Sequence, residues 1–391
     1  MLKGKKWAPI LCFGLLMLAL GSSDALRGIF APVFQQRYAL SDTQLSTVVA
    51  VSYAGNLLFL SVGGKLLDTF PRKKVTLAVT GIWAAAAVLN LVTDNYYGIL
   101  VSMFLALGAS TLLNTTINIL TPALFAGSAG LMVNVLFFMQ GIGTSSSQFI
   151  LGRYAFSYAG WKGINLVLLL VGAATLLLLL GMAVPQPASA AGPAAAAAQR
   201  PEPGRKILLV FAAMMGCYFI GEHGIMNWLM SYCISAFSMS SAEASVSLSV
   251  FWFGMTAGRL LFAPVVQKLG TAKSLSIFGA VGTVMFCAGC LLGRGGIWVL
   301  GASGFALSIL YPTMVLLIQK IYPPATAATR TGAIISIATI ADIVFNLLFG
   351  MAADAWGYRV SFMVVPVCMA GFYLLYRLLL RQVRAGQPET I

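Results

Sequence analysis

Charged residues are scarce in this chain. Asp, Glu, Lys and Arg together make up 9% of its 391 residues, whereas a soluble domain carries about 25%. Hydrophobic residues make up 59%, and the mean hydropathy is +0.91. So little charge cannot cover a water-facing surface, which excludes an ordinary soluble protein. Since helices satisfy their own backbone hydrogen bonds in lipid, the composition predicts an all-α membrane protein.

Several kinds of reactive chemistry are missing too. Histidine occurs once, at position 223, and no serine or cysteine nucleophile motif accompanies it. No glycine-rich loop of the Walker type is present, so we do not expect ATP to be the energy source. All six cysteines fall in apolar runs, and Cys287 and Cys290 form a C-x-x-C without a second ligand pair. We therefore expect no enzymatic activity, no metal site and no bound cofactor.

Apolar runs long enough to cross a bilayer recur along the chain and predict twelve spans. They lie at about residues 8–34, 44–63, 75–93, 97–124, 131–151, 163–184, 207–237, 244–266, 275–292, 297–320, 331–353 and 360–380. Residues 185–206 are rich in Pro, Ala and Gly, which is typical of a linker. We expect an N-terminal six-helix half at 1–184, a cytoplasmic linker at 185–206 and a C-terminal six-helix half at 207–391. The chain's start is also typical of a signal peptide, but the helix count favours a first span.

The basic residues gather on one side of these spans. With the N-terminus in the cytoplasm, seventeen Lys and Arg fall in cytoplasmic segments and five on the opposite side. Cytoplasmic loops of membrane proteins carry this excess. The net charge of +14 therefore indicates a multi-pass protein of the plasma (inner) membrane with both termini in the cytoplasm. It does not indicate a nucleic-acid partner.

The two halves form a repeat. A shift of 199 residues places "LSDTQLSTVVAVSYAGNLLF" on "MSSAEASVSLSVFWFGMTAG", with Tyr53 on Trp252. The same shift places Asp24 on His223. Two six-helix halves related by a parallel repeat are typical of one transporter architecture, in which the site lies at the midplane between the halves.

The loop after the second span carries a recognisable motif. Gly64-Lys-Leu-Leu-Asp68, followed by Arg72, Lys73 and Lys74, resembles the loop motif of the major facilitator superfamily. We expect Gly64 to let helices approach closely, Asp68 to cap or pair with the next helix, and the basic cluster to anchor the loop at the anionic leaflet. The resemblance implies the major facilitator fold, with twelve transmembrane helices in two six-helix pseudo-symmetric halves.

A narrower resemblance runs through the fourth and fifth spans. "NTTINILTP" (114–122), "NVLFFMQGIGTSSSQ" (134–148) and "LYPTMVLLI" (310–318) are similar to segments of the fucose:proton symporter family. That family often carries a glutamate one turn before Asn114, where this chain has Ser110. The resemblance implies a sugar-like substrate with proton symport, and substrate contacts from Asn114, Asn118, Gln140 and Tyr311.

Six ionisable groups lie inside apolar spans: Asp24, Arg27, Glu222, His223, Arg259 and Asp342. A charge at the bilayer centre costs about 3 kcal/mol on the mildest scale, so these groups should face a cavity or one another. In the fold that the chain resembles, the helices that carry them line the central cavity. We expect Asp24, Glu222 and Asp342 to take part in coupling, with H⁺ as the coupling ion and Na⁺ as the alternative.

Structural roles compete with these functional ones. Asp24 and Arg27, at i and i+3, can neutralise each other. Arg259, near the cytoplasmic end of its span, is better placed to anchor or gate than to bind substrate.

Several other polar and aromatic residues face the same choice. His223 shares a face with Asn227, at i+4, and can be a neutral histidine bonded to a neighbouring helix. The pairs Asn114/Asn118 and Asp342/Asn346 can join helices, and Trp228 and Tyr311 can be packing residues or can stack on a substrate ring. We place Arg27, Asn227, Trp228 and Asn346 among the candidate substrate-binding residues, as well as Asp24.

These observations predict a secondary active transporter that moves a small polar solute by alternating access. A sugar with proton symport is the first hypothesis, because amide and carboxylate groups bind vicinal hydroxyls. The alternatives are a carboxylate or zwitterion carrier, with Arg27 or Arg259 pairing the anion, a drug-type exporter, and a non-transporting receptor or scaffold. The expected partners are a small-molecule substrate and the lipid bilayer, and the expected state is a monomer.

Overall fold

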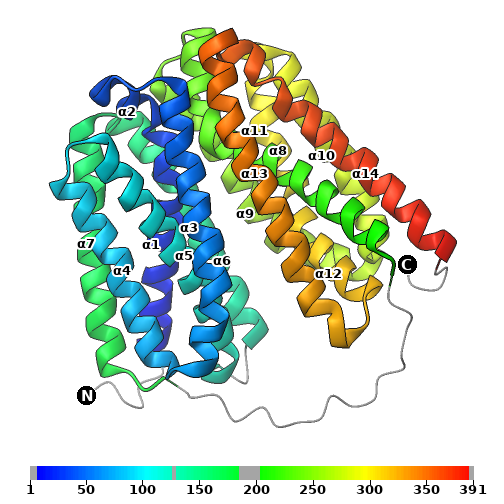
Figure 1. Cartoon of the computed structure of the whole chain (residues 1–391), viewed down its shortest axis with the longest axis horizontal. Helices are drawn as coiled ribbons and strands as arrows, with labels where there is room; N and C mark the ends of the chain where they lie inside the picture. The colour runs from blue at the N-terminus through cyan, green and yellow to red at the C-terminus, as the bar shows by residue number, and fades with distance from the viewer. Residues whose placement is uncertain (1–6, 126–128, 185–202, 387–391) are drawn as a thin grey trace.

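The computed structural model describes residues 7–125, 129–184 and 203–386, which form helices and no strand (Figure 1). The helices are α1 (Trp7–Ile29), α2 (Ala31–Tyr38), α3 (Asp42–Thr69), α4 (Arg72–Val92), α5 (Tyr96–Leu124), α6 (Ala129–Tyr154), α7 (Tyr158–Gly181), α8 (Arg205–Phe237), α9 (Ser241–Leu269), α10 (Thr271–Leu291), the 3₁₀ turn η1 (Gly293–Gly296), α11 (Ile297–Leu307), α12 (Leu310–Ile321), α13 (Pro324–Ser361) and α14 (Val364–Gly386). The all-α prediction is confirmed. Most of the expected linker, residues 185–202, lies outside the described part of the chain.

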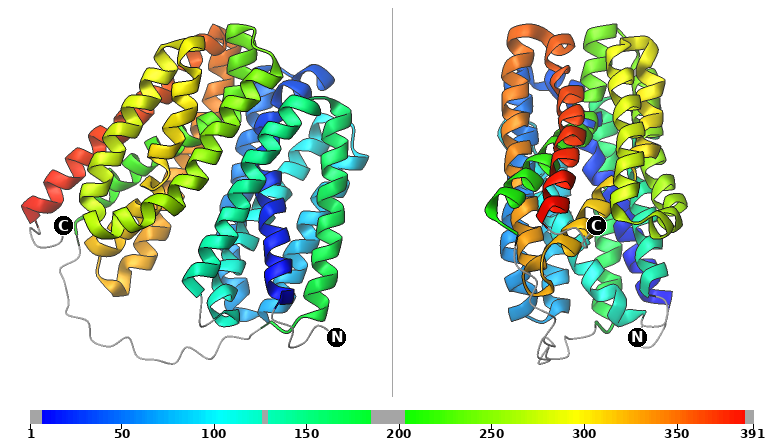
Figure 2. Two further views of the ribbon diagram at one scale, coloured as in Figure 1. Left: turned by 180° about the vertical axis from the view of Figure 1, so that it is seen from behind. Right: turned by 90° about the vertical axis from the view of Figure 1, so that its right-hand side faces the viewer.

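The helices form two groups, α1–α7 and α8–α14, that stand side by side (Figures 1 and 2). They meet chiefly where α3 packs on α13 and where α6 packs on α9. The 199-residue shift carries α3 onto α9 and α6 onto α13, so these two contacts are equivalent. The repeat also appears in the helix starts, because Ser41 with Gln44 and Ser240 with Glu243 form matching capping boxes. The predicted pseudo-symmetry is confirmed.

Eleven helical segments of the described residues are long and apolar enough to cross a membrane. The remaining predicted span is α6, whose second half contains the polar run "TSSSQ" at 144–148. This helix lies between α1 and α9, and Thr144, Ser145, Ser147 and Gln148 are buried. Its polar side chains therefore face other helices and not lipid.

Two predicted spans are broken in the structure, and proline accounts for both breaks. The span expected at 8–34 ends as α1 at Ile29, and α2 begins with Pro32 in its first turn, where a missing N–H is tolerated. The span expected at 297–320 divides into α11 and α12 just before Pro312. Proline cannot donate to the carbonyl four residues earlier, which leaves the carbonyl of Ser308 without its helical partner.

We call the end of the bundle where α1 begins and α14 ends the terminal side, toward the lower left of Figure 1 for α1 and at the right for α14, and the opposite end the far side. At the far side Asp94 accepts hydrogen bonds from Tyr158 and, at 2.7 Å, from Arg37. The bond from Tyr158 and the nearby guanidinium lower the pKa of Asp94. Lys162 donates to three carbonyls at the end of α4, those of Asn90, Leu91 and Thr93. These contacts hold α2, α4 and α7 together at this end.

Candidate functional site

A cavity of about 670 Å³ lies between the two halves. We call it the central cavity. Its walls come from α3, α5 and α6 on one side and from α8, α9, α12 and α13 on the other. Its polar lining consists of Tyr53, Asn56, Thr111, Asn134, Glu222, His223, Thr256, Arg259, Gln267, Tyr311, Thr313 and Thr339. The cavity thus offers charge of both signs, hydroxyls, amides and aromatic rings.

The central cavity opens toward the terminal side. Much of its lining comes from the terminal halves of α6 and α9, namely residues 133, 134, 137 and 138 of α6 and residues 256, 259, 260, 263, 266 and 267 of α9. Figure 1 shows the two halves together at the far side and diverging toward the terminal side. A solute therefore has access from the terminal side in this conformation.

The far side is closed by contacts between α3 and α13. The Asp354 carboxylate accepts hydrogen bonds from the backbone N–H groups of Asp42, at 2.7 Å, and Thr43, at 2.8 Å. Tyr358 donates to the Asp42 carboxylate at 2.7 Å. A Cβ on Gly350 would stand 2.1 Å from the Ser46 hydroxyl oxygen, so only glycine permits this approach. We call Asp42, Thr43, Gly350, Asp354 and Tyr358 the far-side gate.

Asp354→Asn is expected to open the far-side gate, because the carboxylate is the acceptor for the unpaired N–H groups at the start of α3. Hydrogen bonds to a charged group contribute about 1.5–3 kcal/mol, so we expect an at least tenfold rise in far-side exposure. The measurement is the rate at which an impermeant maleimide modifies Ser46→Cys in a cysteine-free background. The matched control is Glu243→Gln, since Glu243 caps its own helix. An unchanged labelling rate in Asp354→Asn would contradict this role.

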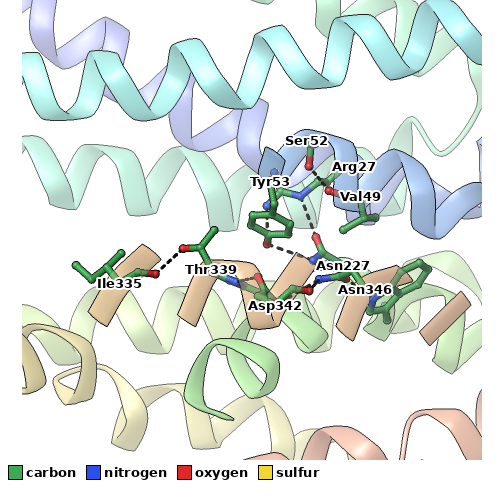
Figure 3. Close-up of polar contacts among 11 residues, drawn as sticks. Arg27, Val49, Ser52, Tyr53, Asn227, Ile335, Thr339, Asp342 and Asn346 are labelled. Atoms are coloured by element: carbon green, nitrogen blue, oxygen red, sulfur yellow. Dashed lines mark hydrogen bonds and ion pairs between the residues drawn. The ribbon is translucent and has the colours of Figure 1, made fainter. Parts of the chain in front are cut away.

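A buried arginine of α1 joins the two halves (Figure 3). Arg27 donates from Nε to Asn227 at 2.9 Å and from Nη2 to the Tyr53 hydroxyl at 3.1 Å, and its guanidinium lies 4.8 Å from the Tyr53 ring centre. Asn227 also donates to the Tyr53 hydroxyl, at 3.2 Å. The helices can approach because α1 crosses α8 at Gly28, where a Cβ would stand 1.9 Å from the Met226 carbonyl oxygen.

The contacts continue from Tyr53 into α8 and α13. The Tyr53 ring stacks on His223, with ring centres 5.0 Å apart, and His223 Nδ1 lies 2.6 Å from Asp342 Oδ2. Asn346 donates to the other Asp342 oxygen at 3.1 Å, and Trp228 donates to Asn346 at 2.9 Å. We call Arg27, Tyr53, Asn227, His223, Asp342 and Asn346 the bridging network.

His223 stands between Asp342 and the central cavity. Its side chain is 24% exposed, whereas that of Asp342 is 0% exposed. His223 lines the cavity and Asp342 does not. The imidazole is therefore a contact through which a proton in the cavity can reach this carboxylate.

The architecture, a cavity between two six-helix repeats with buried ionisable groups, is matched by one family. A family model for the Major Facilitator Superfamily matches residues 12–339. The chain belongs to the major facilitator superfamily. It is a multi-pass membrane transporter and not an enzyme, as the sequence motifs predicted.

Among curated proteins, this facilitator is 23% identical over 133 residues to a glucose/galactose transporter of Brucella abortus, a match that covers 34% of the chain and 32% of that protein. It is 26% identical over 114 residues to a TsgA homologue of Edwardsiella ictaluri, covering 28% of each. The matched part therefore spans about a third of the length of these curated relatives or less.

Solved structures match this facilitator over nearly its whole length. The nucleoside transporter NupG gives a TM-score of 0.72 at 12% identity, covering 96% of this chain and 99% of that one. A D-xylose-proton symporter gives 0.68 at 13% identity, covering 94% and 97%. The superfamily transporter FucP in its outward conformation gives 0.65 at 16% identity, covering 95% and 98%. At these identities the likeness concerns the fold.

The predicted site residues of the facilitator fall into three groups. Glu222, Arg259 and Tyr311 line the central cavity. A second group does not line the cavity: Arg27, Asn227, Trp228, Asp342 and Asn346 are buried within the helix contacts, and Asp24 is half-buried. Trp228 stacks on Phe349, with ring centres 4.5 Å apart, as a packing residue does. The third group, Asn114, Asn118 and Gln140, also does not line the cavity. Other polar residues of the same two helices line it instead, Thr111 of α5 and Asn134 of α6.

Two charged residues make contacts that differ from the simplest prediction. Arg27 turns to Asn227 and Tyr53, and none of the ion pairs among the described residues joins it to Asp24. Arg259 donates from Nε to the Ser308 carbonyl at 3.3 Å. That carbonyl is the one that Pro312 leaves free, so Arg259 stabilises the break between α11 and α12 from within the cavity wall.

In the loop motif, the expected packing role of Gly64 is wrong. A Cβ on Gly64 would meet nothing within 4 Å, whereas one on the adjacent Gly63 would stand 2.3 Å from a Leu112 methyl. Successive helical residues point about 100° apart, so a one-residue difference changes the face. Asp68 is exposed and has no ion pair among the described residues.

The basic residues of the same motif lie at the start of α4. Arg72 is its first residue. Lys73 donates to the carbonyls of Leu180, at 2.8 Å, and Met182, at 2.6 Å, at the end of α7. Cations suit the carbonyl end of a helix. Lys73 therefore joins two helices within the first half.

Sequence reasoning did not place two central residues, Tyr53 and His223, among the site residues. The repeat contained a signal for both, because it paired His223 with Asp24 and Tyr53 with Trp252. Aromatic and imidazole side chains are common in helix packing, so residue type alone does not mark Tyr53 and His223 as site residues. Their positions in the repeat do.

Proposed function

We propose that this facilitator is a symporter that carries a small sugar-like solute together with a proton by alternating access. The observation that supports it most is the pairing of His223, in the cavity wall, with the buried Asp342 at 2.6 Å. This pair can accept a proton from the cavity, and its protonation changes the charge next to Tyr53 and the bridging network.

The sugar-like substrate class draws on the cavity lining and on the relatives. Hydroxyl, amide and carboxylate groups of the lining can bind vicinal hydroxyls, and Phe219, His223 and Tyr53 form a row of rings on which a sugar ring can lie. Three of the similar proteins are named for glucose and galactose, for D-xylose and for nucleosides. Each of these solutes contains a polyhydroxylated ring.

We place the cytoplasm at the terminal side, because exposed lysines and arginines gather there, among them Lys65, Lys74, Lys268, Lys320 and Arg381. The conformation is then inward-facing. A proton and a solute bound from outside would be released through the open cavity into the cytoplasm.

The test is counterflow in proteoliposomes with a panel of hexoses, pentoses, nucleosides, small carboxylates and amino acids. We expect a polyhydroxylated ring solute to exchange and to cause proton uptake on addition, seen as alkalinisation of a weakly buffered medium. Glu222→Gln, which removes the cavity carboxylate, should reduce that alkalinisation. Exchange of a sugar with no proton movement would contradict proton coupling, and Na⁺-dependent accumulation would identify the other ion.

A carboxylate or zwitterion carrier is the second candidate, because the Arg259 guanidinium lines the cavity. Arg27, the other expected anion partner, is 5% exposed and does not line it. In the same panel, exchange of carboxylates that Arg259→Gln abolishes, while all sugars fail, would favour this candidate.

A further inference from the structure

A second hollow of about 460 Å³ lies between α3 and α4 on the outer surface of the first half. We call it the α3–α4 groove. Both helices pack extensively along α5, but they contact each other little although only two residues connect them. Leu112 of α5 forms part of its floor, and its other lining residues are Leu58, Phe59, Val62, Leu66, Phe70, Lys74, Val75, Ala78, Val79 and Ile82.

The groove is apolar along its length and faces the membrane. Every lining side chain except that of Lys74 is apolar. Leu58, Val62 and Phe70 are 51%, 45% and 54% exposed. From Leu58 to Phe70 the groove follows about 18 Å of helix at 1.5 Å per residue. One leaflet of the hydrocarbon core is about 15 Å thick. The groove therefore matches the depth of a single acyl chain.

Positive charge lies at one end of the groove. Lys74 is exposed beside Phe70, at the terminal side where α3 connects to α4. Lys65 and Asp68 lie in the last turns of α3, and Arg72 is the first residue of α4. Lys73 points away, to the carbonyls that end α7. Basic groups at a membrane surface attract anionic lipid headgroups.

We propose that the α3–α4 groove binds one acyl chain of an anionic phospholipid from the terminal-side leaflet, with the headgroup phosphate at Lys74. The lipid fills the space that α3 and α4 leave open above α5. Since α3 also carries Tyr53 and begins at the far-side gate, a lipid in the groove supports the helix that links both sites. This site is separate from the central cavity and independent of the solute carried.

The experiment measures thermal unfolding of the purified full-length protein in detergent with added dioleoyl-phosphatidylglycerol or dioleoyl-phosphatidylcholine. We expect the anionic lipid to raise Tm by at least about 2 °C more than the neutral one. Ala78→Phe, which fills the groove, should remove the stabilisation, and Lys74→Gln should remove the preference for the anionic lipid. Val62→Trp fills the groove from its exposed rim and serves where Ala78→Phe does not fold.

The controls are Val167→Phe, on the exposed face of α7, and Lys320→Gln, an exposed lysine of the other half. Both should respond to lipid as the wild type does. Equal stabilisation of the wild type by the two lipids would overturn the proposal. So would an undiminished response in the groove-filling variants.

Discussion

Asp342→Asn is expected to lower solute accumulation driven by an imposed pH gradient at least 100-fold while counterflow stays within a fewfold of wild type. Asparagine has the shape of aspartate and can still bond to Asn346, but it cannot take up a proton or carry charge beside His223. Downhill exchange needs the cavity and the gates but no net proton movement. The measurement compares ΔpH-driven uptake with counterflow in the same proteoliposomes.

His223→Gln should likewise lose pH-driven accumulation and keep counterflow, because His223 lies between the cavity and Asp342. The matched control is Asp94→Asn, a carboxylate in the far-side connection between α4 and α5, which should keep both activities. Accumulation at wild-type levels in Asp342→Asn would exclude this carboxylate as the proton site and leave Asp24 and Glu222 as the remaining candidates.

Arg27→Ala should both destabilise the protein and abolish transport. The side chain is 5% exposed and makes two hydrogen bonds to neutral partners, one of them in the other half. Each bond from a charged donor contributes about 1.5–3 kcal/mol, and truncation leaves the Asn227 oxygen without this donor. We expect Tm to fall by several degrees and counterflow by at least tenfold.

Arg27→Lys is informative because a lysine ammonium cannot reproduce the planar fork that reaches Asn227 and Tyr53 together. It should recover part of the stability and little of the transport. The matched control is Arg153→Ala, an exposed arginine whose Nε bonds only to the neighbouring Tyr154. Wild-type Tm and wild-type exchange in Arg27→Ala would show that the bridging network is dispensable.

The fold could be predicted because its signals extend over many residues. Apolar runs of bilayer length, the repeat and the charge bias are each averages over whole segments. The breaks at Pro32 and Pro312 are local, and their positions depend on whether a neighbour can satisfy the freed carbonyl. Arg259 does so for Ser308. Nothing in the segment around Pro312 indicates that this partner lies 49 residues earlier.

The sequence indicated how far along each helix the site residues lie, but not which way their side chains point. Glu222 and Asp342 lie near the middles of α8 and α13, yet of the two only Glu222 lines the cavity. The rotation of a helix about its axis decides which of two adjacent residues faces a partner. A hydropathy pattern does not reveal this rotation when all faces of the helix are apolar. For the same reason the sequence does not show which of Gly63 and Gly64 packs against a neighbouring helix. The way a side chain points depends on packing partners that are distant in sequence, such as Tyr53 for Arg27.

The far-side gate has a consequence for how conformational change can be observed. The backbone N–H groups of Asp42 and Thr43 belong to the first turn of α3, which offers them no intrahelical acceptor. Their acceptor is Asp354, on the other half. Opening of the far side breaks these two hydrogen bonds, so the hydrogen–deuterium exchange rates of the two amides follow the open population. The protein thus carries a label-free reporter of its own alternating access in the backbone of two residues.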